Sequence, residues 1–220
     1  MDKQILYHGS RGGIEGVIRP RSLVRCDFGT GFHMGTDPER AKTLVSNDEA
    51  PYFYKLELNL TRLPEERILR LDGLEGAYFV LFNRGRLDNV KGSDLYRNCS
   101  LLALGKDLII GPAADGAMNT AMHRFLHGEI TDRTLLECIQ SLDCGLQYTA
   151  KTAAACASIS ILEEKELRVK ELDDAVERSE QRRREGVKLI DEIQRRDRHE
   201  GKYFDEILQE QSRGDRRSFP

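Results

Sequence analysis

The spacing of apolar and polar residues predicts short strands and helices that alternate through about the first 160 residues. Strands are expected where β-favouring residues alternate with polar ones, as at 52–60, or form a short apolar run, as at 107–110. Helices are expected where apolar residues recur every three or four positions, as at 118–127. The other predicted strands are 4–7, 32–34, 68–71, 146–149 and 158–161, and the other predicted helices are 38–46, 75–84, 132–142 and 151–157.

The order of these elements predicts the fold class. Strands and helices interleave without the regular strand–helix–strand period of a doubly wound sheet. Residues 87–97 show no clear period and are expected to form a loop that ends in a helix or turn. We therefore expect one α+β domain over residues 1–162.

The composition changes after residue 162. Among residues 163–220, 17 side chains are acidic and 15 are basic. Apolar residues keep helical spacing in a narrow stripe, which Gly186 and Gly201 interrupt. We therefore predict a charged extension of two or three helices with a frayed tail at 212–220. A stripe this narrow rarely stabilises a free helix, so we expect the extension to pack on the first domain, to self-associate or to bind a partner protein.

Residues 27–41 combine a glycine turn, a strand and a capped helix in one short stretch. Gly29 and Gly31 supply the turn, and either Thr36 or Asp37 can cap the helix. The glycine spacing differs from the G-x-G-x-x-G dinucleotide motif, and neither a Walker lysine nor the other protein-kinase motifs accompany it. A compact unit of this kind usually places the residues of its strand at the wall of a cleft.

Four short motifs resemble those of a bacterial group of ADP-ribosyltransferase-like domains. They occur in the family's order as Tyr7-His8-Gly9, the run from Asp27 to His33, the run from Ile110 to Asp115, and Gln147-Tyr148 followed by Lys151-Thr152. The second motif is also similar to a signature of the poly-ADP-ribose polymerases, which carry a tyrosine where this chain has His33. The resemblance implies a split β-sheet core with flanking helices, related to the fold of these polymerases and of diphtheria toxin.

The activity that this resemblance implies is transfer of ADP-ribose from NAD to a macromolecular acceptor, with release of nicotinamide. NAD is then a substrate, and a protein is the expected acceptor. Breaking the bond between nicotinamide and ribose builds positive charge on the sugar, much as in glycoside cleavage. A protein can assist by holding NAD in a bent pose, by stacking on the nicotinamide and by hydrogen bonding to the ribose.

The resemblance assigns three catalytic positions. His8 would hold the adenosine-side ribose through a hydroxyl, His33 would stack on the nicotinamide, and Gln147 would contact a hydroxyl of the nicotinamide ribose. The backbone of Gly9 would pair with the nicotinamide carboxamide, which requires a residue without Cβ. The full set of expected NAD-binding residues is Tyr7, His8, Gly9, Phe28, Gly29, Gly31, Phe32 and His33.

Three positions depart from patterns common in this fold. His33 is smaller than tyrosine and adds a titratable nitrogen. Gln147 stands where a glutamate is common, and a neutral hydrogen bond contributes about 0.5–1.5 kcal/mol against roughly 1.5–3 for one to a charged group. Gln147 therefore favours single transfer, or hydrolysis of NAD, over growth of an ADP-ribose chain. Gly145 lacks the side chain that orients arginine acceptors in related toxins, which makes arginine a less favoured target.

Two further functions fit the same residues. The domain could bind NAD or ADP-ribose without catalysis and act as an interaction module through its helical extension. It could also be an RNA 2′-phosphotransferase-like enzyme, because the phosphotransferases built on this fold also use a pair of histidines. Those enzymes need specific arginines that the sequence does not place.

The composition limits which binding partners, metals and cellular compartment are expected for this protein. A net charge of −3 gives no bulk basic surface, so nucleic acid is not an expected partner, and no apolar run is long enough to span a membrane. His123 and His127 lie four residues apart without a third ligand at zinc spacing, so no metal is expected. Five cysteines without a C-x-x-C pair predict a reducing compartment and a cytoplasmic location. A bacterial effector or toxin injected into a host would show the same cysteine usage.

Overall fold

The computed structural model describes residues 3–22, 25–114, 116–197 and 200–212. Asp115, in the third sequence motif, lies outside the described residues, as does the predicted frayed tail apart from the backbone of residue 212. The described elements confirm the α+β class that the sequence pattern predicts.

Seven strands of the described chain form one mixed sheet in the order β4-β5-β6-β2-β1-β3-β7. Their bounds are β1 (Lys3–Arg11), β2 (Phe32–Gly35), β3 (Pro51–Asn59), β4 (Ile68–Arg70), β5 (Leu108–Pro112), β6 (Leu146–Ala150) and β7 (Ile159–Glu166). Neighbouring strands run antiparallel except for β4 and β5, which are parallel. Strand β7 continues past residue 162, where the sequence predicts the end of the first domain.

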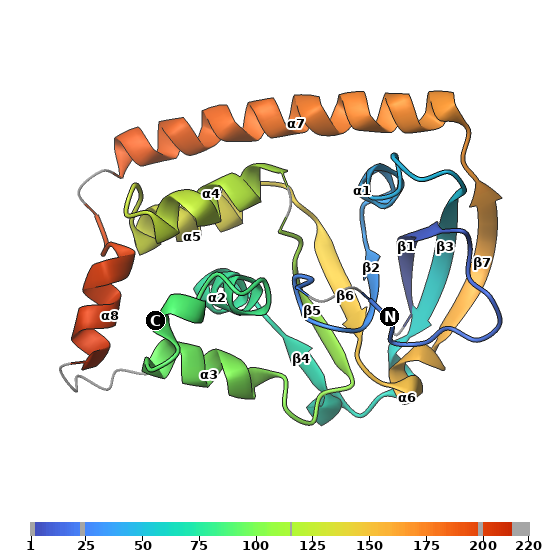
Figure 1. Cartoon of the computed structure of the whole chain (residues 1–220), viewed down its shortest axis with the longest axis horizontal. Helices are drawn as coiled ribbons and strands as arrows, with labels where there is room; N and C mark the ends of the chain where they lie inside the picture. Colours follow the sequence, from blue (N-terminus) through green and yellow to red (C-terminus); the bar gives the residue numbers. More distant parts are fainter. Residues whose placement is uncertain (1–2, 23–24, 115, 198–199, 213–220) are drawn as a thin grey trace.

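The sheet is weakly joined at its centre. Strands β1 and β3 pair along the whole of β1, and β2 pairs with β6 along all of β2. Between these two halves, β1 and β2 share a single residue pair, Tyr7 opposite Gly35. The sheet therefore consists of two well-paired halves, β4-β5-β6-β2 and β1-β3-β7, which this one residue pair joins. Figure 1 shows the two groups of strands.

The helices surround the sheet unevenly. Their bounds are α1 (Pro38–Thr43), α2 (Gly73–Asn83), α3 (Asp94–Leu102), α4 (Gly116–Leu126), α5 (Asp132–Ser141), α6 (Ala153–Cys156), α7 (Val169–Arg196) and α8 (Phe204–Ser212). Figure 1 shows α2 to α5 and α8 grouped on the β4 side and α1 near β2. Helix α3 occupies the place where the sequence predicts only a loop ending in a helix or turn, and the side chain of Ser93 caps it at the backbone N–H of Tyr96.

The apolar core has three parts. The largest cluster fills the space among α2, α4, α5 and α8 and contains Phe28, Tyr78 and Phe125. A second cluster includes apolar side chains of strands β1 to β6, and a small third cluster links α1, β3 and α7. The core therefore supports both halves of the sheet and the base of α1.

Helix α7 is one continuous helix of 28 residues, so the interruption predicted at Gly186 is wrong. Gly186 is buried against α4, where a Cβ atom would overlap Ala117 and approach Leu142 to 3.1 Å. The glycine therefore allows two helices to approach closely, and the packing outweighs its low helix propensity. Gly201, by contrast, does lie between α7 and α8 as predicted.

The charged extension packs on the first domain, which is one of the outcomes that the sequence predicts. Leu172 of α7 joins the cluster that contains α1, while Ile190 and Ile193 join the large helical cluster. Phe204 of α8 packs edge-to-face on Phe125, with ring centroids 5.5 Å apart. Figure 1 shows α7 crossing the molecule from α1 to α4 and α5, so one helix connects two parts of the core.

Replacing Gly186 with alanine is expected to cost about 1–3 kcal/mol, because the added methyl group overpacks the contact between α7 and α4. Alanine returns about 1 kcal/mol through its higher helix propensity, so we expect a net destabilisation of up to about 2 kcal/mol. Chemical denaturation measures the change. Arg183→Ala, an exposed substitution on the same helix, serves as the control, and a Gly186→Ala protein as stable as the wild type would show that α7 does not pack tightly on α4.

Candidate active site

Three strands bring His8, His33 and Gln147 together. His33 and Gln147 lie on the adjacent antiparallel strands β2 and β6, where Gly35 pairs with Gln147 and His33 pairs with Thr149. Paired residues of antiparallel strands share a face, and so do residues two apart along a strand, so His33, Gln147 and Thr149 project to the same side. His8 comes directly after Tyr7, the residue of β1 that pairs with β2. Its ring therefore reaches the backbone of His33 across the junction of the two half-sheets.

The three residues line one pocket of about 250 Å³ at this junction. Its other lining residues are Tyr7, Gly9, Cys26, Met34, Gly35, Asp37, Arg40, Ala41 and Leu44. The wall is therefore formed by β1, β2, β6 and the first turns of α1.

His8 has a defined tautomer. Its Nδ1 lies 2.6 Å from the backbone carbonyl oxygen of His33. A carbonyl oxygen can only accept a hydrogen bond, so Nδ1 carries the proton and Nε2 of the neutral ring is an acceptor. The ring also packs on Phe32, with centroids 4.4 Å apart. His8 can therefore accept a hydrogen bond from a ligand hydroxyl.

Gln147 is oriented by its neighbours. Nη2 of Arg40 lies 3.3 Å from Oε1 of Gln147, and arginine can only donate, so the amide nitrogen faces His33 and Thr149. Oγ1 of Thr149 lies 2.8 Å from Nδ1 of His33. The arrangement that satisfies all three side chains has the threonine hydroxyl donating to Nδ1, which leaves the proton of the neutral ring on Nε2.

Nε2 of His33 is itself buried and has no hydrogen-bond partner within the part of the chain that the structure describes. An unpaired buried polar atom costs free energy, and such atoms are often found where a ligand binds.

Burial keeps both histidines neutral. It lowers the pKa of His8 to about 4, although the hydrogen bond to the His33 carbonyl opposes this change. Burial is also the main cause that lowers the pKa of His33 to about 4. The negative charge of Asp27 raises the pKa of His33, while the positive charges of Lys151 and Arg40 lower it. At neutral pH the pocket therefore contains two uncharged imidazole rings.

A buried carboxylate holds the loop beside the pocket. Asp27 is 8% exposed and accepts hydrogen bonds from Arg40 at 3.3 Å and from Nε of Arg84 at 2.8 Å. Nζ of Lys151 donates to the backbone carbonyl of Phe28 at 2.7 Å. These bonds attach the loop that precedes β2 to three neighbours, namely α1, the end of α2 and the end of β6. Arg40 also bonds to Gln147, so it connects Asp27 to Gln147.

The structure gives different positions to the other residues expected to bind NAD. Tyr7 and Gly9 line the pocket, and a Cβ at Gly9 would overlap the carbonyl oxygen of Ala41, so glycine here also permits the packing of α1 on β1. Phe28 and Phe32 are buried in the core and do not line this pocket. Gly29 and Gly31 lie in the loop against side chains of α2 and β6.

Sequence reasoning missed Arg40, Asp27 and Thr149 as parts of the site. All three lie within or beside the motifs, but no motif indicates their roles. Arg40 reaches Gln147 because α1 packs on β1 with Ala41 inward. For Thr149 alone the sequence contains a signal. It lies two residues from Gln147 on a predicted strand, so the two side chains must share a face.

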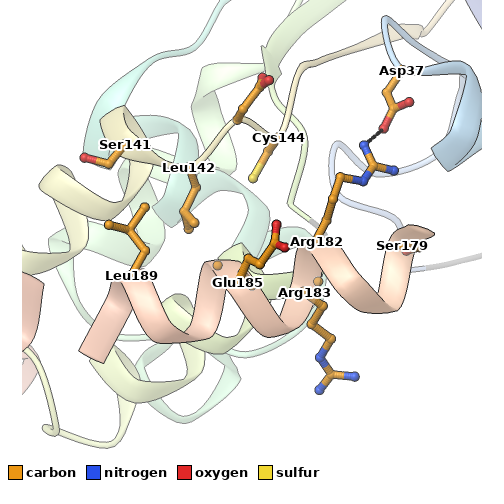
Figure 2. Close-up of a pocket in the computed structure, with 13 residues that line it drawn as sticks. Asp37, Ser141, Leu142, Cys144, Ser179, Arg182, Arg183, Glu185 and Leu189 are labelled. Carbon is orange, nitrogen blue, oxygen red and sulfur yellow. Dashed lines mark hydrogen bonds and ion pairs between the residues drawn. The ribbon is translucent and has the colours of Figure 1, made fainter. Parts of the chain in front are cut away.

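A second pocket of about 280 Å³ lies between α7 and the loop that leads into β6. Figure 2 shows Arg182 of α7 reaching Asp37, and Oδ2 of Asp37 accepts this bond at 2.6 Å. Oδ1 of the same carboxylate caps α1 at the backbone N–H of Glu39, whose own side chain accepts a bond from Nε of Arg178 at 2.9 Å. Asp37 lines both pockets. Through Arg182 and Arg178, α7 therefore holds the start of α1, which forms one wall of the first pocket.

The fold and the site define an α+β domain with a pocket where two half-sheets meet. A family described as "Protein of unknown function (DUF3990)" matches residues 4–161, so the chain belongs to this family. The match ends inside β7, and α7 and α8 lie beyond it. Neither the curated proteins nor the solved structures contain a significant match to this chain.

Among the described residues, no group of three or more histidine, cysteine, aspartate or glutamate side chains has the arrangement of a metal site. No helix in the same residues has the length and apolar character needed to cross a bilayer.

Proposed function

We propose that the protein is a mono-ADP-ribosyltransferase that takes ADP-ribose from NAD and transfers it to a protein acceptor. The observation that carries the proposal is the convergence of His8, His33 and Gln147, from distant parts of the chain, on one pocket. These are the three positions to which the family resemblance assigns catalytic roles. The division of the sheet at the β1–β2 contact also agrees with the split core expected for such enzymes.

The proposed reaction breaks the bond between the nicotinamide nitrogen and C1′ of the ribose. Nicotinamide leaves with the bonding electrons, and the resulting sugar cation is attacked by a nucleophile of the acceptor, which loses its proton to solvent. The groups of the pocket suit this path because they hold NAD and support the sugar without having to provide a nucleophile of their own.

Each of the three residues has a role that fits its hydrogen bonds. Nε2 of His8 accepts a hydrogen bond from a ribose hydroxyl. The buried N–H at Nε2 of His33 can donate a hydrogen bond to the nicotinamide end of the ligand. Gln147 contacts the nicotinamide ribose, with its amide held by Arg40 on one side. The pocket volume is below the roughly 300–1,000 Å³ typical of complete ligand sites, so it would enclose only part of NAD.

A catalytically silent NAD-binding module is the second candidate. It is favoured by the state of Gln147, which is uncharged and already hydrogen-bonded to Arg40. In that case the pocket would hold NAD or ADP-ribose without breaking the nicotinamide bond, and the protein would act through its charged extension.

Incubation of the full-length protein with NAD labelled in the adenylate and, separately, in the nicotinamide is the decisive experiment. Under our proposal free nicotinamide accumulates and label appears on the protein or on an added lysate protein, whose modified residue mass spectrometry identifies. Saturable binding of NAD without nicotinamide release would support the silent module. Formation of a cyclic phosphate of ADP-ribose from NAD only when 2′-phosphorylated RNA is added would instead indicate the phosphotransferase. Failure to bind NAD at all would refute both the transferase and the silent module.

A further inference from the structure

A separate pocket on the helical side of the protein is lined by polar and basic side chains. It measures about 240 Å³ and lies between the end of α2, the outer face of α4 and the start of α8. Its polar lining consists of Arg84, Arg86, Asn89, Asn119, His123 and His127. It shares no lining residue with the candidate active site.

The charge of this pocket is opposite to that of the chain. The protein has 37 acidic and 34 basic residues, yet no carboxylate is found among the described residues that line the pocket. Asp88, next to Asn89, is engaged by Lys91 at 3.8 Å. Asp27 is shared between Arg84 and Arg40, so one carboxylate faces two guanidinium groups. The pocket therefore retains a net positive charge.

Two arginines have donors that no described residue uses. Arg86 is exposed, and its side chain makes no hydrogen bond or ion pair with any described residue. Arg84 is held by Asp27, by the carbonyl of Ala114 and, through Nη1 at 2.8 Å, by Asn119. A guanidinium group has five N–H donors. The contacts of Arg84 with described residues, which include a second one from Nη2 to Asp27, leave one Nη1 hydrogen unused.

Helix α4 supplies the opposite wall. Asn119 and His123 lie four residues apart on one face of the helix, and His127, just past its C-terminus, continues this spacing through a backbone hydrogen bond to the His123 carbonyl. The two imidazole rings stack with centroids 4.0 Å apart, and Nδ1 of His127 donates to the His123 carbonyl at 2.8 Å. The histidines that the sequence presents as a simple polar face thus border a cavity that contains arginines.

We propose that this pocket binds the phosphate group of a small molecule, with Arg86 and Arg84 as the principal donors and Asn119 beside them. Arginine matches the oxygens of phosphate because its donors are planar, fixed in direction and always charged. The pocket is larger than a phosphate ion, so it leaves space for the rest of a phosphate ester against Leu81, Leu126 and Phe204. Binding here does not require NAD turnover, because the two pockets share no lining residue.

Titration of the full-length protein with AMP and with inorganic phosphate tests the proposal. Binding is followed by calorimetry and by the imidazole NMR signals of the protein. We expect saturable binding in which the signals of His123 and His127 move while those of His8 and His33 do not. Tighter binding of AMP would show that the ester group contributes, and equal affinities would show that the phosphate alone is recognised.

Substitution of Arg86 separates a specific site from general attraction to a basic surface. Arg86→Gln should weaken binding about tenfold, since it removes one charged donor without disturbing the core. Arg183→Gln, an exposed arginine on α7, should leave the affinity unchanged. The proposal is overturned if neither probe binds at millimolar concentration, if Arg86→Gln binds as tightly as the wild type, or if only the signals of His8 and His33 move.

Discussion

Replacing Gln147 with alanine is expected to reduce nicotinamide release from NAD by about 10- to 100-fold, because it removes a side chain held at the proposed position of the nicotinamide ribose. The fold should persist, since Asp27 still holds Arg40 and Thr149 still contacts His33. The measurement is the initial rate of nicotinamide release at saturating NAD, together with the circular dichroism spectrum of the variant.

Two further variants sharpen this test. Gln140→Ala, an exposed glutamine on α5, should release nicotinamide at the wild-type rate. Gln147→Glu should release it faster by about fivefold, because a charged acceptor strengthens the hydrogen bond to the ribose hydroxyl. Unchanged release by Gln147→Ala would remove this residue from the mechanism.

The stability of the protein should decline as the pH falls from 6.5 towards 4. Burial lowers the pKa values of His8 and His33 from 6.5 to about 4, so between these values the unfolded chain binds protons that the folded protein does not. Proton uptake by the unfolded chain then favours unfolding. Each histidine should reduce the free energy of unfolding by roughly 2 kcal/mol between pH 7 and pH 5, which urea denaturation at the two pH values measures.

His8→Asn tests the origin of this pH dependence. The asparagine amide can still donate to the His33 carbonyl but does not titrate, so the difference between pH 7 and pH 5 should fall by about half. His127→Asn, an exposed substitution just past the end of α4, serves as the matched control. An undiminished pH dependence in His8→Asn would mean that the folded protein does not hold this ring neutral.

The sequence predicted most elements of the fold because their periods are regular, but it could not show where the elements pack. Gly186 was expected to interrupt a helix, since an isolated glycine lowers helix propensity. Its contact with Ala117 is tertiary and has no local signal. Strand β7 also extends beyond its predicted end, because Glu163, Glu164 and Glu166 obscure the apolar pattern on a strand that is exposed along most of its length.

The candidate site was predicted in part for a similar reason. His8, His33 and Gln147 lie within recognisable motifs, and strand pairing brings them together. Arg40 was not predicted because its position depends on how α1 packs on β1. Phe28 and Phe32 belong to the glycine-rich motif yet are core residues in the structure, so a motif marks the segment that forms a site without showing which side chains face the ligand.

The position of α7 affects how the protein should be produced for experiment. A fragment cut at residue 161, where the family match ends, would sever β7 and leave most of the outer edge of β3 open to pairing with other molecules. It would also remove Ile190, Ile193 and Phe204 from the large apolar cluster. Such a fragment would be prone to aggregate, and an inactive preparation of it would say nothing about the chemistry of the intact chain.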